Sequence, residues 1–387
     1  MNTRDEWICL ASVQGVGEET FNSLIGEFGS AGAALEAVRD GRFDSWFQRR
    51  RQEDGRVPMI KSAVAALRAT AANPTQPLQA ISALGLWTYT SLDTDYPARL
   101  RDLPDPPPVI HGLGDRQALH GLRTVGIVGT RRPTPQGRAL AAKIAARVVE
   151  FEATVVSGLA VGIDGAAHAA TLDNEGRAVG VIGGGHHFPG PRAHQRLRDE
   201  VVARGGAVIS EHHPDDHPKL GTFPRRNRII AALSDAVLVV EAPTRSGAIN
   251  TANHALGLGR PVFVAPGRVG EWSVAGALKL LHDTPARPLI GLDELVEDLG
   301  YLSVPVAAED SEEQQAVSSR EAALATLGAA ERAIARRLAE GPAGLDLLVA
   351  ETGYGPQVVS SAVTFLLMRG WVHAAGPAYI AAGPLAA

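Results

Sequence analysis

The sequence is poor in the features that build covalent or membrane-bound structure. Cys9 is the only cysteine in 387 residues, which excludes a disulfide framework within the chain and a cysteine zinc cluster. No uninterrupted apolar run approaches the roughly 20 residues that span a bilayer. The first ten residues include Asp5 and Glu6 and lack the long apolar segment of a signal peptide. We therefore expect a soluble cytoplasmic protein with no membrane partner.

Standard nucleotide and hydrolase motifs are also missing. The sequence contains no G-x-x-x-x-G-K-[ST], no G-x-G-x-x-G and no G-x-S-x-G. The formal net charge of −5 argues against a protein that is coated in nucleic acid by bulk attraction. A local basic groove is still possible, because phosphate contacts act through nearby charges.

Composition and periodicity divide the chain into four parts. We expect a helical domain over residues 1–85, an α/β domain over 86–302 that begins with a proline-rich connector, a flexible linker over 303–325 and a winged-helix-like domain over 326–387. Gly15 and Gly17 mark a tight turn like that of helix-hairpin-helix modules. No lysine or arginine lies near this turn, which favours a plain structural turn over a phosphate site.

The α/β domain is predicted to be a doubly wound, mainly parallel sheet. Apolar strands at 124–130, 153–160, 178–185, 207–210, 236–242 and 261–267 alternate with helices at 137–151, 165–176, 192–206, 228–234 and 249–259. Near-continuous apolar runs are typical of strands that are buried on both faces, and the alternation predicts right-handed crossovers.

Four glycine-containing loops would then gather at the carboxyl ends of the strands, where open α/β sheets bind ligands. They read GTRRPTPQG, SGLAVGIDGAAH, GGGHHFPG and APTRSGAINTA. Glycine lets backbone N–H groups approach a phosphate, and a helix N-terminus adds partial positive charge. Ser157, Ser246 and Thr251 could donate further hydrogen bonds, and Arg131 could hold a phosphate bidentately.

The stretch TFPRRNRIIAALS places Arg225, Arg226 and Arg228 around Asn227 at the start of a helix, with Lys219 just upstream. Arginines are unfavourable at a helix N-terminus, so a purely structural surface would rarely carry three of them there. We predict that they close a groove that binds several phosphates.

Two other clusters have alternative readings. Ser157, Asp164 and His168 could form a hydrolytic triad, but Asp164 as a helix N-cap and His168 as an ordinary helix residue are favoured. The run EHHPDDH at 211–217 is rich in metal-binding residue types, but a proline-flanked loop favours solvated side chains, so no metal is expected. Glu241, at the end of a strand, has two alternative roles, a structural one and the orientation of loop N–H groups.

Taken in order, these motifs resemble the DNA-processing protein A (DprA, also called Smf) family. The resemblance rests on GTR at 129–131, SGLAVGIDGAAH, FPRRNRIIAALS, VVEAPTRSGAINTA and GRPVFVAPG, with DYPARLRDLPDPPPVIHGLG upstream. It implies an extended Rossmann-like domain between a helical domain and a winged-helix-like domain.

The resemblance also implies a function. Members of the family bind single-stranded DNA, deliver it to the RecA recombinase during natural transformation, act as homodimers and are not known as enzymes. We therefore expect no catalytic residue, metal or cofactor. Motif positions and loop chemistry together give the expected DNA-binding residues, which are Gly129, Thr130, Arg131, Ser157, Gly158, Lys219, Arg225, Arg226, Asn227, Arg228, Ser246 and Gly247.

Three positions depart from the family pattern. Thr130 replaces the usual serine and keeps the hydroxyl, Phe188 stands where a tyrosine is usual, and Asn250 stands where an apolar or hydroxyl residue is frequent. Aromatic residues make up only 5% of the chain, so few rings are available for base stacking. Phe188 and Phe223 are the nearest candidates, and core packing is the favoured role for both. Binding dominated by the backbone and sensitive to salt is expected.

Two other functions remain open from the sequence. A Rossmann-like enzyme that binds or hydrolyses a nucleotide would need Asp164 or Glu241 as a base. A protein–protein scaffold would work through its winged helix.

Overall fold

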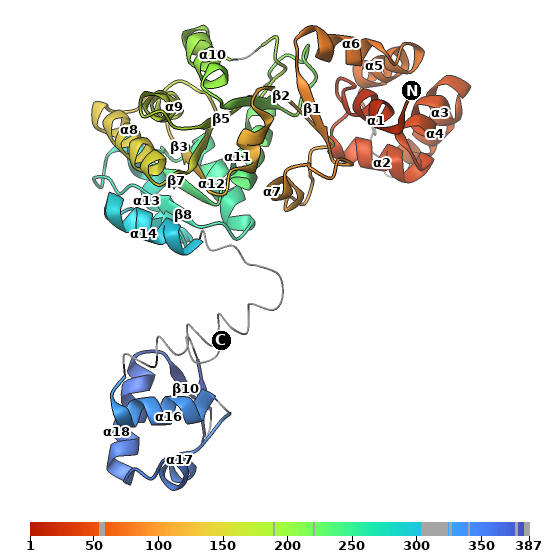
Figure 1. The fold of residues 1–387 in the computed structure, drawn as a ribbon. Coiled ribbons are helices and arrows are strands. Elements are labelled where there is room, and N and C mark those ends of the chain that lie inside the picture. The colour runs from red at the N-terminus through yellow and green to blue at the C-terminus, as the bar shows by residue number, and fades with distance from the viewer. Residues whose placement is uncertain are drawn as a thin grey trace. The chain divides into compact units, whose positions relative to one another are not determined.

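The computed structural model describes residues 1–53, 59–188, 190–219, 221–302, 324, 327–339, 341–375 and 378–382 (Figure 1). The chain divides into two compact units, Met1–Ser303 and Val304–Ala387. The predicted linker 303–325 lies outside the described residues except for Leu324.

The first unit begins with helices that pack around their own apolar core. They are α1 (Thr3–Ala11), α2 (Glu18–Phe28), α3 (Ala31–Asp40), α4 (Arg42–Glu53), α5 (Lys61–Ala72) and α6 (Gln76–Ala83). Ser30 caps α3 by accepting a hydrogen bond from the Ala33 N–H at 3.1 Å. Leu10, Phe21 and Leu24 are buried at the centre of this cluster. The helices therefore have a hydrophobic core separate from that of the sheet.

A nine-stranded sheet within the described residues forms the rest of this unit. Its strands are β1 (Trp87–Thr90), β2 (Val109–Gly114), β3 (Thr124–Val128), β4 (Thr154–Ser157), β5 (Ala178–Val181), β6 (Ala207–Ser210), β7 (Ala236–Val239), β8 (Val262–Val264) and β9 (Arg287–Pro288). Their order in space is β1-β2-β6-β5-β4-β3-β7-β8-β9. The strands from β3 to β9 are parallel to their neighbours, whereas β1 and β2 join the edge antiparallel. The proline-rich connector thus supplies the two strands at one side of the sheet, with β1 at the edge.

The strand order reverses direction between β3 and β7. From β3 the chain moves outward through β4, β5 and β6, and then returns to place β7 beside β3. In open α/β sheets a crevice opens at such a switch point, beyond the carboxyl ends of the strands. The topology therefore selects the loops after β3 and β7 as the place for a ligand.

Helices cover both faces of the sheet. The connecting helices are α7 (Ala98–Arg101), α8 (Pro135–Glu150), α9 (Ile163–Asp173), α10 (Gln195–Ala203), α11 (Thr222–Leu233), α12 (Gly247–Gly257), α13 (Ala275–Asp283) and α14 (Leu292–Leu302), with 3₁₀ turns at Arg116–His120, Arg192–His194 and Trp272–Val274. Side chains from α8, α9 and α14 pack into the core on one face, and those from α11 and α12 into the core on the other.

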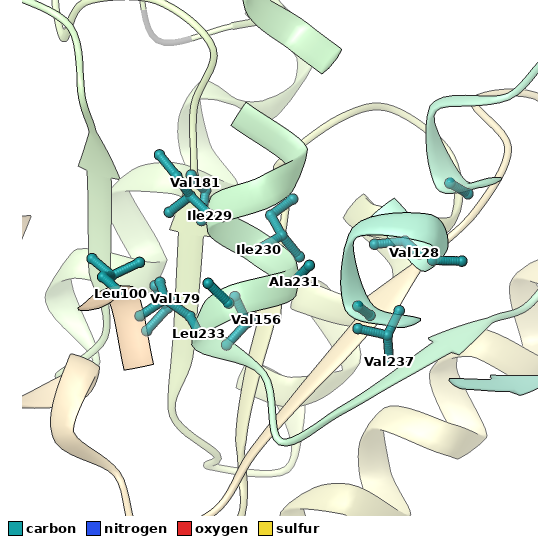
Figure 2. Close-up of a cluster of buried hydrophobic side chains, with 14 of the residues drawn as sticks. Leu100, Val128, Val156, Val179, Val181, Ile229, Ile230, Ala231, Leu233 and Val237 are labelled. Atoms are coloured by element: carbon teal, nitrogen blue, oxygen red, sulfur yellow. The ribbon is translucent and has the colours of Figure 1, made fainter. Parts of the chain in front are cut away.

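Helix α11 is the most deeply buried of these helices at its C-terminal end. Ile229, Ile230, Ala231 and Leu233 lie against strand residues such as Val181, as Figure 2 shows. This is the apolar run that follows the three arginines in the sequence. Burial of the run fixes the arginine-rich start of α11 at the carboxyl-end rim of the sheet.

In the described part of the second unit, helices precede a two-stranded sheet. They are α16 (Ala329–Ala339), α17 (Leu345–Thr352) and α18 (Pro356–Met368), followed by the antiparallel strands β10 (Val372–Ala375) and β11 (Ala378–Ala381). The predicted fold class is confirmed: a mainly parallel α/β sheet, a helical N-terminal part and a winged-helix-like C-terminal part.

The central strand β3 gives a direct test of the sheet core. Ile127 is fully buried, and Ile127→Ala should destabilise the first unit by about 2–5 kcal/mol, because it removes buried methyl groups and leaves a cavity. Urea unfolding followed by circular dichroism measures the effect. Leu122→Ala is the control, since Leu122 is 93% exposed and its removal should change little. Equal effects of the two substitutions would contradict this packing.

Candidate nucleic-acid interface

Two adjoining cavities lie at the carboxyl ends of the strands. The switch-point cavity, of about 480 Å³, is bounded by the loops after β3 and β7 and by the start of α11. The glycine-loop cavity, of about 630 Å³, is bounded by the loops after β4 and β5. Arg131, Ala160, Phe223 and Arg226 line both cavities, which we together call the groove. Eight of the predicted residues line it: Gly129, Thr130, Arg131, Gly158, Arg226, Asn227, Ser246 and Gly247.

Arg226 lies at the centre of the groove wall and is almost fully buried. Its Nη1 donates a hydrogen bond to the Val181 carbonyl at 2.6 Å. The guanidinium lies so close to Gly158 that a Cβ atom there would overlap it, so this position requires glycine. Burial lowers the pKa of Arg226 to about 10, against the opposing effect of Asp164. The side chain therefore remains charged at neutral pH.

Asp164 is the buried partner of this arginine. Its Oδ2 accepts a hydrogen bond from the Gly158 N–H at 3.1 Å. Burial raises the pKa of the carboxyl, while Arg226 and backbone hydrogen bonds from Gly158, Gly129 and Ala160 act in the opposite direction. Asp164 is the second residue of α9 and the N-cap is Gly162, so the prediction of an N-cap role was wrong.

Several backbone amides of the glycine loops are hydrogen-bonded within the protein. The N–H groups of Gly129, Gly158 and Ala160 serve Asp164, and the Thr130 N–H donates to the Glu241 carbonyl at 2.7 Å. The Glu241 carboxylate accepts a hydrogen bond from the Thr134 N–H at 2.9 Å at the start of α8. These groups are occupied by the protein itself, so they cannot form the predicted amide cradle for phosphate.

No hydrolytic triad is assembled by Ser157, Asp164 and His168. The Ser157 hydroxyl is fully buried and donates to the Ile127 carbonyl at 2.6 Å, so this residue does not reach the groove as predicted. Burial lowers the pKa of His168 to about 4, which keeps the imidazole neutral. Among the residues that the structure describes, no three His, Cys, Asp or Glu side chains are grouped to hold a metal ion.

Asn227 and Ser246 line the groove but fasten one helix to another. The Asn227 amide donates to the Gly247 carbonyl at 3.1 Å and to Asn250 Oδ1 at 3.0 Å. Ser246 caps α12 by accepting from the Ala248 N–H at 3.2 Å. Asn250, which departs from the family pattern, is thus a partner of Asn227. These polar side chains set the position of the loop that carries Arg245.

The free positive charge of the groove comes from exposed arginines. Arg131, Arg132 and Arg245 line the switch-point cavity and are exposed. Within the described part of the chain none of them forms an ion pair. Arg132 and Arg245 were not among the predicted site residues, although both lie in the loops that the sequence singled out. Both are next to a predicted site residue in the same loop, Arg131 and Ser246 respectively, and this adjacency could have identified them.

Aromatic rings also reach the groove. Phe223 is partly exposed, lines both cavities and has the Arg131 guanidinium 5.3 Å from its ring centroid. Phe188 is partly exposed in the glycine-loop cavity, with its ring 3.7 Å from that of His217. The expectation that both rings serve core packing is therefore wrong: each of them faces a cavity.

Arg225, Arg228 and Lys219 line neither cavity of the groove. The prediction that Arg225 and Arg228 face the groove is wrong, because both pair with a carboxylate of the protein. Arg228 is buried and paired with Glu18 of α2 and with Glu211, at 2.7 Å from the latter. Arg225 is half-exposed and also pairs with Glu18. Only Arg226 of the three arginines faces the groove. We call Glu18, Glu211, Arg225 and Arg228 the interdomain ionic cluster.

The Gly15–Gly17 turn belongs to the same contact. Gly17 lies against the Arg225 guanidinium, and Gly15 packs closely on Ala63. Lys219 lines a separate cavity of about 160 Å³ between this turn and the loop that precedes α11. The reason given from the sequence for a plain structural turn does not hold in the fold, because Arg225 contacts Gly17 and Lys219 lines the same cavity.

The fold and the groove define a doubly wound α/β protein with a basic crevice at its topological switch point. Residues 87–300 match the family described as DNA recombination-mediator protein A, residues 318–376 the DprA winged helix domain, and residues 2–41 the DprA-like N-terminal HHH domain. The chain belongs to the DNA recombination-mediator protein A (DprA/Smf) family.

Similar proteins occur in several bacteria. The chain is 39% identical to Protein Smf of Synechocystis over 225 residues, 57% of this chain and 56% of that protein. It is 38% identical to the DNA processing protein DprA of Bacillus subtilis over 215 residues, 56% of this chain and 72% of that protein. The first alignment thus spans little more than half of the relative's length.

Two solved structures share the fold. DNA processing protein A of Streptococcus pneumoniae superposes with a TM-score of 0.60 at 27% identity, covering 77% of this chain and 98% of that one. DNA processing protein A of Helicobacter pylori, which binds single-stranded DNA, gives a TM-score of 0.51 at 29% identity and covers 56% of this chain and 96% of that one. No helix in the described residues is long and apolar enough to cross a membrane.

Glu18→Ala tests the interdomain ionic cluster. The substitution leaves Arg228 buried with one carboxylate fewer, and breaking a buried pair costs about 3–5 kcal/mol. Urea unfolding should show a loss of this size. The control Asp44→Ala breaks the exposed Arg68–Asp44 pair and should have almost no effect. A Glu18→Ala protein as stable as the wild type would show that the cluster contributes nothing to the fold.

Proposed function

We propose that this protein is a single-stranded DNA-binding mediator that protects incoming DNA and loads RecA recombinase on it during natural transformation. The observation that carries the proposal is the set of exposed arginines around the groove, Arg131, Arg132 and Arg245, which form no ion pair with any residue that the structure describes. Their charge is available to an external anion. A chain of net charge −5 that concentrates free cations in one crevice favours a localised polyanion.

The size of the groove supports a nucleotide strand over a single phosphate. The two cavities of about 480 and 630 Å³ each fall in the range of roughly 300–1,000 Å³ that holds drug-sized ligands. They adjoin at Arg131 and Phe223, so neighbouring nucleotides of one strand could occupy both.

The rings in the groove favour unpaired bases. Phe223 and Phe188 are partly exposed within the cavities. Aromatic rings stack on splayed bases of single strands, whereas the bases of a duplex already stack on one another. The related H. pylori protein binds single-stranded DNA, which agrees with this preference.

A nucleotide-hydrolysing enzyme is less well supported by the same geometry. Asp164 lines the switch-point cavity, but its carboxylate accepts the Gly158 N–H and lies beside Arg226. The Glu241 carboxylate is hydrogen-bonded to Thr134. Both candidate bases thus have structural partners, so we propose a function without catalysis.

Arg131→Ala should weaken single-stranded DNA binding. Loss of one phosphate contact should lower the affinity about tenfold and reduce the slope of log affinity against log salt by about 0.7. Fluorescence anisotropy with a labelled oligonucleotide at several salt concentrations measures both values. The matched control Arg68→Ala removes the same charge from the helical domain and should bind like the wild type. An equal loss of DNA affinity in the two variants would show that the effect comes from the net charge of the protein and not from a contact in the groove.

Delivery to RecA and self-association are separate parts of the proposal. In the presence of the wild-type chain, RecA should coat single-stranded DNA after a shorter lag, and Arg131→Ala should lose this effect together with its DNA affinity. Sedimentation should show a homodimer for both proteins, because Arg131 lies in the groove. A lag that the wild-type chain leaves unchanged would contradict the mediator role.

A further inference from the structure

Trp272 differs from the other tryptophans in the described residues. Trp46 is buried, and Trp7 and Trp87 are partly buried with their indole N–H groups donating to the Pro108 and Gly114 carbonyls. Trp371 is partly buried against the core of the second unit, with the Arg369 guanidinium 5.3 Å from its ring. Trp272 is 67% exposed, and in the part of the chain that the structure describes its ring makes no hydrogen bond and no aromatic contact. Single exposed apolar residues are common on protein surfaces, so exposure alone does not assign a binding role to Trp272, and its location must be considered.

The position of Trp272 is at the groove. Trp272 lines the switch-point cavity together with Arg131, Arg132 and Arg245. Phe188 lines only the glycine-loop cavity, Phe223 lines both, and Trp272 lines only the switch-point cavity. The shared lining residues therefore give the order Phe188, Phe223, Trp272 along the groove.

The backbone that carries Trp272 is anchored. The N–H groups of Gly276 and Ala277 donate to the Ala242 carbonyl at 2.9 and 3.0 Å, which ties this segment to the loop after β7. Val274 is buried, and its side chain packs so closely on Gly267 that a Cβ there would overlap it. A ring on an anchored backbone loses little conformational entropy when a flat ligand stacks on it.

We propose that Trp272 is a stacking platform for a nucleobase of the bound strand, beyond the bases that lie beside Phe223 and Phe188. The inference rests on the proposed single-stranded DNA binding and extends the strand's path across the switch point. Base–aromatic stacking contributes about 1–3 kcal/mol per base, which corresponds to about 5- to 100-fold in affinity. The neighbouring Arg245 is placed to neutralise the adjoining phosphate.

The test compares two ligands of equal charge. The full chain is titrated with a mixed-sequence single-stranded oligonucleotide and with an abasic oligonucleotide of the same length, which keeps the phosphates and lacks the bases. Trp272→Ala should lose about 5- to 100-fold in affinity for the first and nothing for the second. Trp272→Phe should retain most of the affinity. Arg131→Ala should lose affinity for both ligands.

Tryptophan fluorescence gives an independent readout. Binding of the base-containing strand should quench part of the emission, and Trp272→Phe should abolish that part. If wild type and Arg131→Ala behave as expected but Trp272→Ala binds both ligands like the wild type, or loses equally on both, the stacking proposal is overturned while DNA binding stands. A change in sedimentation with unaltered DNA affinity would assign the ring to self-association and overturn the proposal. Absence of binding by the wild type would overturn both proposals.

Discussion

A buried arginine beside a buried aspartate holds the groove together. Arg226 donates to the Val181 carbonyl at the end of β5 and lies against Gly158 after β4. Asp164 accepts the Gly158 N–H and has a further backbone hydrogen bond from Gly129 after β3. Groups at the ends of three neighbouring strands thus contact these two opposite charges. Removal of either charge would take away the electrostatic effect that opposes the burial cost of the other, so the shape of the groove is expected to depend on both.

The sequence predicted much of the fold from local pattern. The apolar runs marked the strands from β3 to β8, and the carboxyl-end rule brought Arg131, Gly158 and Ser246 to one rim. Arg225 and Arg228 were misplaced, because their partner Glu18 lies about 200 residues earlier and belongs to another part of the fold. The prediction for Ser157 was wrong because its hydroxyl donates to the Ile127 carbonyl on the neighbouring strand β3. That contact depends on the strand order, which the local sequence does not reveal. Trp272 follows no motif, and only the tertiary contacts of its segment bring it to the groove.

Three arginines in the first turns of α11 conflict with the helix dipole, and from the sequence alone this conflict predicts a phosphate groove. The structure resolves it with carboxylates of the protein. Arg225 and Arg228 pair with Glu18, and Arg228 also pairs with Glu211, while Arg226 lies beside Asp164. An unfavourable charge pattern in a sequence therefore indicates that an anion is near, without telling whether that anion is a ligand or a distant part of the same chain.

What separates the two kinds of arginine is whether the fold already neutralises them. Arg228 is buried among carboxylates, and its ion pairs join the helical domain to the sheet. Arg131, Arg132 and Arg245 are exposed in loops fixed by Asn227, Ser246 and Glu241, and they form no ion pair within the described residues. Exposed ion pairs contribute little to stability, so the fold would be about equally stable with or without carboxylate partners for these three arginines. Their clustering around one crevice of an acidic protein contributes little to the fold through ion pairs, and the proposed binding of a polyanion would account for it.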